Sequence, residues 1–187
     1  MALSLQKLIL GRRSVSAFLP ELPKDFDNIL SRAIDAARFA PNHKRTEPWM
    51  FYRLGATSHQ RLSHLVYTNE LAKGNVDNAA KSKAAKWERV PCIVGLTSKT
   101  DTNEIRSLEN YAATCCAAQN FMLSLTAAGL GSKWVTGAMA AHQGTRDLLW
   151  VSGEERVVGL FWVGQPAITP PPPAKLRNIQ DILINIP

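Results

Sequence analysis

Two adjacent arginines and a serine, Arg12, Arg13 and Ser14, directly follow a glycine near the start of the chain. Two guanidinium groups and a hydroxyl offer several hydrogen-bond donors together, and a phosphate dianion is best held by several donors at once. The same motif is also compatible with two solvent-exposed arginines on a turn that bind no ligand. The motif therefore indicates a phosphate clamp only where other motifs support it.

A second polar segment, "APNHKRTEPW" (40–49), carries three consecutive potentially cationic side chains between Pro41 and Pro48. His43 and Lys44 offer donors to a ligand, and the two prolines restrict the path of the backbone. Polar loops are usually only connections between elements. On its own, this loop predicts no ligand.

Two further motifs are weak when taken singly. In "GLGSKWVTGAMA" (129–140), glycines border an expected strand and allow backbone N–H groups to approach a ligand closely. The segment is neither a dinucleotide fingerprint nor a phosphate-binding P-loop. Near the end of the chain, Lys175 and Arg177 are two residues apart, so their side chains point the same way if the backbone is extended.

Hydrophobic periodicity between these motifs predicts a mixed α and β chain with about four strands. Glycines and prolines mark most of the expected boundaries. We predict helices at 3–10, 24–40, 57–88 (with a break near 73–78), 103–131 and 144–150, and strands at 50–54, 90–98, 132–140 and 155–166.

The overall composition is that of a globular protein with one sizeable core. The chain has 187 residues, of which 45% are hydrophobic and 20% charged. A net charge of +7 is compatible with nucleic acid or with small anionic ligands. The basic residues are spread along the chain, with one modest cluster at 81–89, and no zinc-finger or basic-region pattern accompanies them. We therefore expect no nucleic-acid partner.

Three features of the sequence bear on the compartment and on membrane insertion. The small-residue-rich segment 112–131 has Gln119 and Asn120 near its middle, which favours a buried core or interface helix over a membrane span. No secretory signal is expected at the N-terminus. Cys92, Cys115 and Cys116 fit neither a disulfide framework nor a zinc pattern, so we expect buried thiols in the cytoplasm and no metal.

Taken together and in this order, the motifs resemble the FMN-dependent nitroreductase family, in its compact branch of short bacterial nitroreductase-like proteins. The resemblance covers nearly the whole chain. It is carried by Arg12-Arg13-Ser14, by Ala40-Pro41 and Pro48-Trp49, by the 129–132 turn with Trp134 and Gly137, by Gly164-Gln165-Pro166, and by the basic tail with Lys175 and Arg177.

The resemblance implies an α+β, nitroreductase-like fold, with a central, mainly antiparallel sheet flanked by helices, in an interlocked homodimer. It implies a single domain over 1–187, whose tail, 167–187, packs on the partner subunit. The implied cofactor is FMN at the subunit interface, with NADH or NADPH as co-substrate. The implied activity is ping-pong transfer of two electrons by hydride transfer to a nitroaromatic, a quinone or an activated alkene.

The resemblance also assigns the cofactor-binding residues, while the flavin itself does the chemistry and no side chain is assigned as catalytic. Ser16 stands where many members carry a basic residue that reaches the flavin ring, and the turn 124–129 is a candidate nicotinamide contact. The positions assigned to FMN are Arg12, Arg13, Ser14, Ser16, His43 and Lys44 of the other subunit, Trp134, Val135, Thr136, Gly137, Lys175 and Arg177.

Two other classes of protein remain open at this point. A flavin-binding protein without turnover would bind FMN but would not oxidise NAD(P)H. A basic nucleic-acid-binding protein would be colourless and would lose affinity steeply with salt.

Overall fold

The computed structural model describes residues 4–170, 172 and 176–186. A four-stranded sheet forms its centre, in the order β1-β2-β4-β3, and all neighbouring strands are antiparallel. The α+β class and the central antiparallel sheet are therefore confirmed. The strands are β1 (Trp49–Arg53), β2 (Cys92–Lys99), β3 (Gly131–Val135) and β4 (Glu155–Gly164).

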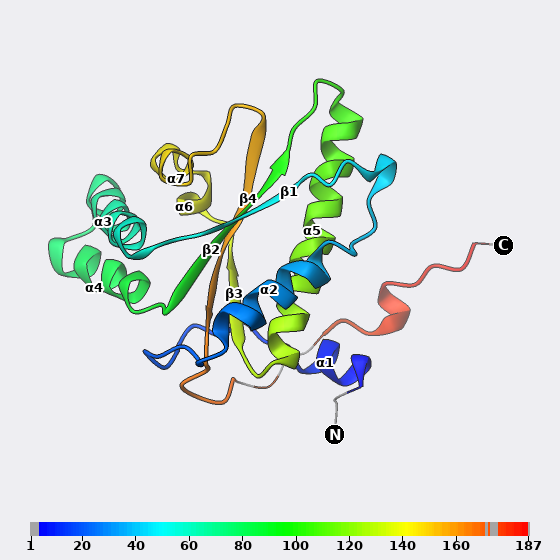
Figure 1. Cartoon of the computed structure of the whole chain (residues 1–187), viewed down its shortest axis with the longest axis horizontal. Coiled ribbons are helices and arrows are strands. Elements are labelled where there is room, and N and C mark those ends of the chain that lie inside the picture. Colours follow the sequence, from blue (N-terminus) through cyan, green and yellow to red (C-terminus); the bar gives the residue numbers. More distant parts are fainter. Residues whose placement is uncertain (1–3, 171, 173–175, 187) are drawn as a thin grey trace.

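The two central strands, β2 and β4, are apolar on both faces, because both faces of the sheet are covered by helices. Helices α2 (Phe26–Ala37) and α5 (Glu104–Ala127) cover one face. Helices α3 (Ala56–Ala72) and α4 (Asp77–Glu88) cover the other face, together with the short α6 and α7 (Figure 1). The structure thus has two cores, one on each side of the sheet.

One expected strand is wrong in its second half. The sequence analysis predicts a strand over 132–140, whereas β3 ends at Val135 and the short helix α6 (Ala138–Ala141) follows. Gly137 is the residue that precedes this helix, and the four residues after it are alanines and a methionine, which favour helix over strand. A second short helix, α7 (Gln143–Leu148), leads into β4.

The expectation that all three cysteines are buried is correct for one of them. Cys92 is buried in the core, and this burial raises the pKa of its thiol to about 11. Cys115 is half-buried and Cys116 is exposed on α5. Cys116 lies on the side of α5 that faces away from the sheet, and Cys115 lies next to that side. Small residues are common both in cores and at interfaces, so their pattern alone does not predict what covers this side of the helix.

The two ends of the described chain leave apolar side chains in contact with solvent. Helix α1 (Leu5–Gly11) has no buried residue, and the single-turn 3-10 helix η2 (Ile179–Asp181) lies in a tail that extends past α5 (Figure 1). Among the described residues, no helix is both long and apolar enough to cross a membrane. The exposed large apolar residues of these ends include Leu5, Ile9, Leu10, Leu176, Ile179, Ile182, Leu183, Ile184 and Ile186.

The start of β3 is packed so closely against an N-terminal segment that it has no room for a side chain. A Cβ placed on Gly131 would lie 2.7 Å from Cγ2 and 2.8 Å from Cβ of Val15. Val15 is itself buried, and its N–H donates to the carbonyl of Ser132 over 3.0 Å. The glycine therefore lets the segment that contains Arg12–Ser16 lie directly against the edge of the sheet.

Gly131→Ala is expected to lower the free energy of unfolding by about 1–3 kcal/mol, because the methyl group must displace the stiff Val15 side chain. Urea unfolding followed by circular dichroism measures this change. Gly153→Ala is the matched control, since nothing lies within 4 Å of its Cβ position, and it should change stability by less than about 0.5 kcal/mol. Equal stability of the two variants would contradict the packing argument.

Candidate functional site

The segment 12–16 forms an extra, irregular strand along the edge of the sheet. Ser14 makes a parallel bridge to Ser132 of β3, and Phe18 makes an antiparallel bridge to Pro166. Ser14 and Ser16 are exposed, while Val15 between them is buried, as the alternation of an extended strand requires. The two serine hydroxyls therefore remain available to a ligand beside β3.

Arg13 is held firmly but not fully satisfied. Its guanidinium donates from one nitrogen to the carbonyls of Leu10 (2.7 Å) and Arg12 (2.8 Å). Its Nε is buried and has no partner among the described residues. A buried donor without an acceptor is costly, so this nitrogen is suited to meet an acceptor from a ligand.

A groove lies between α4 and β3, which we call the α4–β3 groove. It consists of two adjoining cavities of about 490 and 460 Å³ that share Lys86, Lys133 and Trp162. A volume of this order suits a small organic ligand or cofactor. The first cavity also contacts Glu70, Asn75, Ala79, Ser82, Lys83, Trp87 and Val135, and the second also contacts Ser16, Ala17, Phe18, Arg89 and Val90.

Positive charge in the α4–β3 groove is only partly neutralised. The carboxylate of Glu70 accepts from Lys83 and Lys73, each at 3.0 Å, and these ammonium groups lower the pKa of Glu70. Within the described residues, no carboxylate lies within 4.0 Å of the charged nitrogens of Lys86, Arg89 or Lys133. The charges that line the second cavity therefore suit an anionic or electron-rich group.

Trp162 forms the apolar wall shared by both cavities. Its ring lies edge-on to Trp87, with centroids 5.0 Å apart, and Nζ of Lys133 lies 4.7 Å from its ring centroid. The indole is 6% exposed, and its Nε1 is buried with no partner in the part of the chain that the structure describes. The wall thus combines a flat aromatic surface with a fixed cation.

The four assigned residues at the end of β3 do not share one environment. Val135 lines the α4–β3 groove, whereas the side chain of Trp134 points into the opposite core, where it stacks on Phe161 with centroids 5.5 Å apart. Thr136 lines a separate cavity of about 330 Å³ with Arg146 and Arg156. Gly137 is exposed at the start of α6. Trp134 can therefore offer a ligand its backbone but not its indole.

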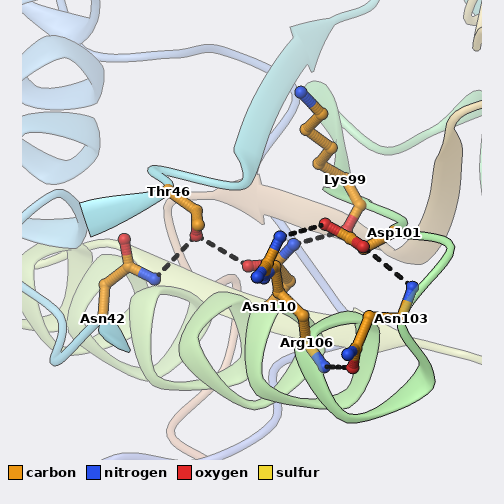
Figure 2. A network of polar contacts seen from close by, with 7 residues as sticks. All are labelled: Asn42, Thr46, Lys99, Asp101, Asn103, Arg106 and Asn110. Carbon is orange, nitrogen blue, oxygen red and sulfur yellow. Dashed lines mark hydrogen bonds and ion pairs between the residues drawn. The ribbon is translucent and has the colours of Figure 1, made fainter. Parts of the chain in front are cut away.

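The polar loop before β1 is held by a chain of side-chain hydrogen bonds (Figure 2). Asn42 donates to the hydroxyl of Thr46 (3.0 Å), which donates to the amide oxygen of Asn110 on α5 (2.6 Å). Asn110 in turn donates to the carbonyl of Lys99 at the end of β2 (3.2 Å). A second bond joins the N–H of Glu47 to Asn42 (2.8 Å). The loop is thus fixed to the sheet and to α5.

The backbone of this loop is strained. Lys44, Arg45 and Glu47 have φ values of 63°, 50° and 43°, a left-handed conformation that costs non-glycine residues roughly 1–2 kcal/mol each. Such strain persists only where the surroundings impose it, and it is frequent at functional sites. His43 and Lys44 belong to the single-turn 3-10 helix η1 (His43–Arg45), and Nδ1 of His43 lies 3.0 Å from the carboxylate of Glu109.

This loop and the α4–β3 groove lie at opposite edges of the sheet. The loop leads into β1, which is one edge strand, and the groove borders β3, which is the other. Figure 1 shows η1 beside the upper part of α5, on the side of the sheet away from α4. His43 and Lys44 are therefore not brought together with Ser14, Ser16 and Val135 within one chain.

The tail and the turn 124–129 complete the positions assigned from the sequence. Lys175 lies outside the described residues, and Arg177 donates to the carbonyl of Asp181 within the tail rather than to the Arg12–Ser14 segment. The turn forms the last residues of α5 and its end, where Gly129 takes a φ of 79°. Residues 127–129 of this turn are exposed in the single chain.

Sequence reasoning missed the cations of the groove. Lys83 and Lys86 of α4, and Arg89 directly after its last residue, follow one another at intervals of three residues, so they share one face of the helix and its end. That spacing was available in the basic cluster 81–89, although nothing in the sequence says which element the face meets. Lys133 lies inside a motif that was assigned, yet alternation along β3 puts it opposite Trp134 and into the groove.

A helix-covered antiparallel sheet with a cation-lined groove at its edge defines an α+β protein whose groove suits an electron-rich or anionic ligand. Within the described ranges, no cluster of three histidine, cysteine, aspartate or glutamate side chains is placed to hold a metal ion. The sequence pattern of the nitroreductase family matches residues 9–165. The chain therefore belongs to the nitroreductase family, and its class is that of an oxidoreductase.

Similar proteins agree with this assignment. The chain is 26% identical over 165 residues to "Putative NAD(P)H nitroreductase YdjA" of Escherichia coli strain K12, covering 87% of this chain and 88% of that protein. The crystal structure of a nitroreductase-like family protein from Bacillus cereus matches with a TM-score of 0.86 and 25% identity, covering 100% and 97% of the two chains. A mutant of the FMN and NADPH-dependent nitroreductase NfnB from Sphigopyxis sp. strain HMH shares the fold, with a TM-score of 0.77, 17% identity and coverage of 97% and 98%.

Asn110→Ala should release the loop 42–47, because it removes the acceptor of Thr46 and a donor to Lys99. We expect amide hydrogen exchange in the loop to rise at least tenfold, with a loss of about 1–3 kcal/mol in stability. Asn120→Ala is the control on the same helix, since Asn120 donates to Ala36 (3.3 Å) and makes no contact with the loop. Loop exchange that is the same in both variants would show that the strained loop is held by other contacts.

Proposed function

We propose that this protein is an FMN-dependent NAD(P)H oxidoreductase that passes two electrons to a small acceptor by ping-pong hydride transfer. The acceptor is a nitroaromatic, a quinone or an activated alkene. The observation that carries the proposal is the α4–β3 groove, with its unpaired cations, beside the donors of the Arg12–Ser14 segment. The nitroreductase family and the FMN and NADPH dependence of the structural neighbour NfnB support it.

The donors of this chain fit the two ends of FMN. A phosphate dianion suits Arg12, Arg13 and Ser14, where the buried Nε of Arg13 has no acceptor in the part of the chain that the structure describes. A flat ring system that gains negative charge on reduction suits a groove with an indole wall and three cations that no carboxylate of the described residues pairs. We assign the ribityl chain to the path between them, along Ser14, Ser16 and the edge of β3.

The loop at the other edge of the sheet supports a site shared between two copies. His43 and Lys44 are held outward in a strained loop that lies too far round the molecule to serve the groove of its own chain. We assign them to the flavin of the partner subunit. Arg177, and Lys175 with it, are assigned to the phosphate once the tail is placed in the dimer.

The exposed apolar residues of the chain support the same arrangement. Ile105 and Leu108 on α5 are 71% and 68% exposed, and Ala112 and Cys116 continue their stripe at helical spacing. Apolar surface of this extent marks a protein–protein interface. We propose that 1–187 acts as one nitroreductase-like domain, that α5 packs against a second copy, and that the tail 167–187 lies on that copy.

In this proposal, the protein positions the reactants and stabilises charge, and FMN supplies the two-electron redox chemistry. With FMN bound, the cations of the groove would stabilise the negative charge that the ring gains on reduction, and we assign the backbone of Val135, Thr136 and Gly137 to the ring. Solvent can supply protons, so no side chain is assigned as acid or base. The turn 124–129 is assigned to the nicotinamide nucleotide, and the cytoplasm remains the predicted compartment.

Arg12→Gln should weaken FMN binding by about 10- to 100-fold, because it removes one charge-assisted contact to the phosphate. Riboflavin lacks the phosphate, so its affinity should change less than twofold. Fluorescence quenching on titration measures both affinities. Arg38→Gln is the control, since Arg38 pairs with Asp35 (3.0 Å) on the surface of α2.

The absorption spectrum of the parent protein distinguishes an enzyme that turns over from a protein that only binds flavin. Flavin absorption near 450 nm should bleach on anaerobic addition of NADPH or NADH and return when an acceptor is added. Bands that persist would leave a flavin-binding protein without turnover. A colourless protein that takes up neither FMN nor riboflavin would overturn the assignment of the groove.

Leu108→Glu should convert the homodimer to a monomer, because two charges would meet at the centre of the paired α5 helices. We expect at least a tenfold rise in the dimer dissociation constant by light scattering, and a parallel loss of bound FMN. Val76→Glu is the control, as Val76 is 72% exposed at the start of α4, in the other helical layer. A parent protein that is monomeric at high concentration would contradict the shared site.

A further inference from the structure

We propose that Lys133 sets the redox potential of the bound flavin by holding a positive charge against its ring system. The inference rests on the proposed binding of FMN in the α4–β3 groove. It assigns to Lys133 a tuning role for electron transfer, beyond a contribution to affinity.

Lys133 is the groove cation whose position is best fixed. It projects from β3, a strand of the sheet, whereas Lys86 and Arg89 project from the surface of α4 and are exposed. Its ammonium group lies over the ring of Trp162, at 4.7 Å from the centroid, and Trp162 is 6% exposed and packed against Trp87. The strand and the aromatic wall therefore restrict where this charge can go.

The other polar groups of the groove do not replace this charge. Lys83 is paired with Glu70 at 3.0 Å, which compensates its charge. Ser16, which lines the same cavity as Lys133, is neutral. Lys133 lies in both cavities of the groove, and no carboxylate of the described residues approaches it within 4.0 Å. An electron-rich ligand thus meets its full charge.

The effect of that charge follows from the balance of the reduction. At neutral pH, two-electron reduction of FMN adds two electrons and one proton to the ring system, so the reduced ring carries one more negative charge than the oxidised ring. A nearby cation therefore stabilises the reduced form more than the oxidised form, and the difference is larger where less water screens the charge. Lys133 therefore raises the midpoint potential of the bound cofactor.

Lys133→Met tests this directly, because it keeps an unbranched side chain of similar length and removes the charge. Oxidised FMN, and FMN reduced with dithionite, are titrated into each apoprotein under anaerobic conditions. We expect the affinity for reduced FMN to fall about tenfold more than that for oxidised FMN, on the order expected for one partly screened charge. For a two-electron couple, this ratio lowers the midpoint potential by about 30 mV.

Three matched variants separate charge from packing. Lys133→Arg should keep the parent potential, and Ser16→Lys in the Lys133→Met background should restore most of it by returning a cation to the same cavity. Lys81→Met should leave the potential unchanged, since Lys81 pairs with Asp77 (2.7 Å) away from the groove. Thermal melting of each apoprotein checks that it is folded.

The outcomes also distinguish this inference from the proposal beneath it. A parent protein that binds no FMN defeats the proposed function itself. A parent that binds FMN, with a folded Lys133→Met variant of unchanged potential, overturns only the role of Lys133. A potential that falls equally in Lys133→Met and Lys133→Arg assigns the effect to packing on Trp162 and also overturns it.

Discussion

The site depends on how the edge strand β3 is anchored. The indole of Trp134 stacks on Phe161 and donates to the carbonyl of Val158 (3.2 Å), which fixes β3 to β4 from one face of the sheet. Alternation along the strand then forces Lys133 and Val135 to the other face, toward α4. A partly buried aromatic residue that packs against one core thus determines which side chains face the groove on the opposite side.

Much of the fold could be predicted from the sequence, because its elements have strong local signals. The central strands were recognisable as uninterrupted apolar runs, and glycines or prolines marked the ends of the long helices. The prediction of a strand over 132–140 was wrong in its second half because the residues after Gly137 suit a helix as well as a strand. Only the tertiary path of the chain decides between the two. The prediction that Cys116 is buried was wrong for a similar reason, since small residues suit a core and an interface equally.

The site was less predictable than the fold, because its residues come from distant parts of the chain. Order and spacing selected Arg12–Ser14 and the end of β3 as candidate ligand contacts, and in the structure Ser14 bridges Ser132 of β3. The cations Lys86 and Arg89 were visible only as a basic cluster, because pairing of α4 with the β3 edge is a property of the fold. For the same reason, sequence spacing could not reveal that the loop with His43 lies at the opposite edge of the sheet from β3.

Two features of the isolated chain are unfavourable, and the proposed function accounts for both. Within the described residues, three like charges in the α4–β3 groove, those of Lys86, Arg89 and Lys133, have no carboxylate partner, and left-handed residues are held in the loop before β1. In the proposed dimer, an anionic ligand would lower the free energy of the first, and contact with that ligand across the subunit interface would give the second a function. Because one ligand then contacts groups of both copies, its binding and the association of the subunits must favour each other by linkage. A sequence optimised only for the stability of one chain would keep neither feature.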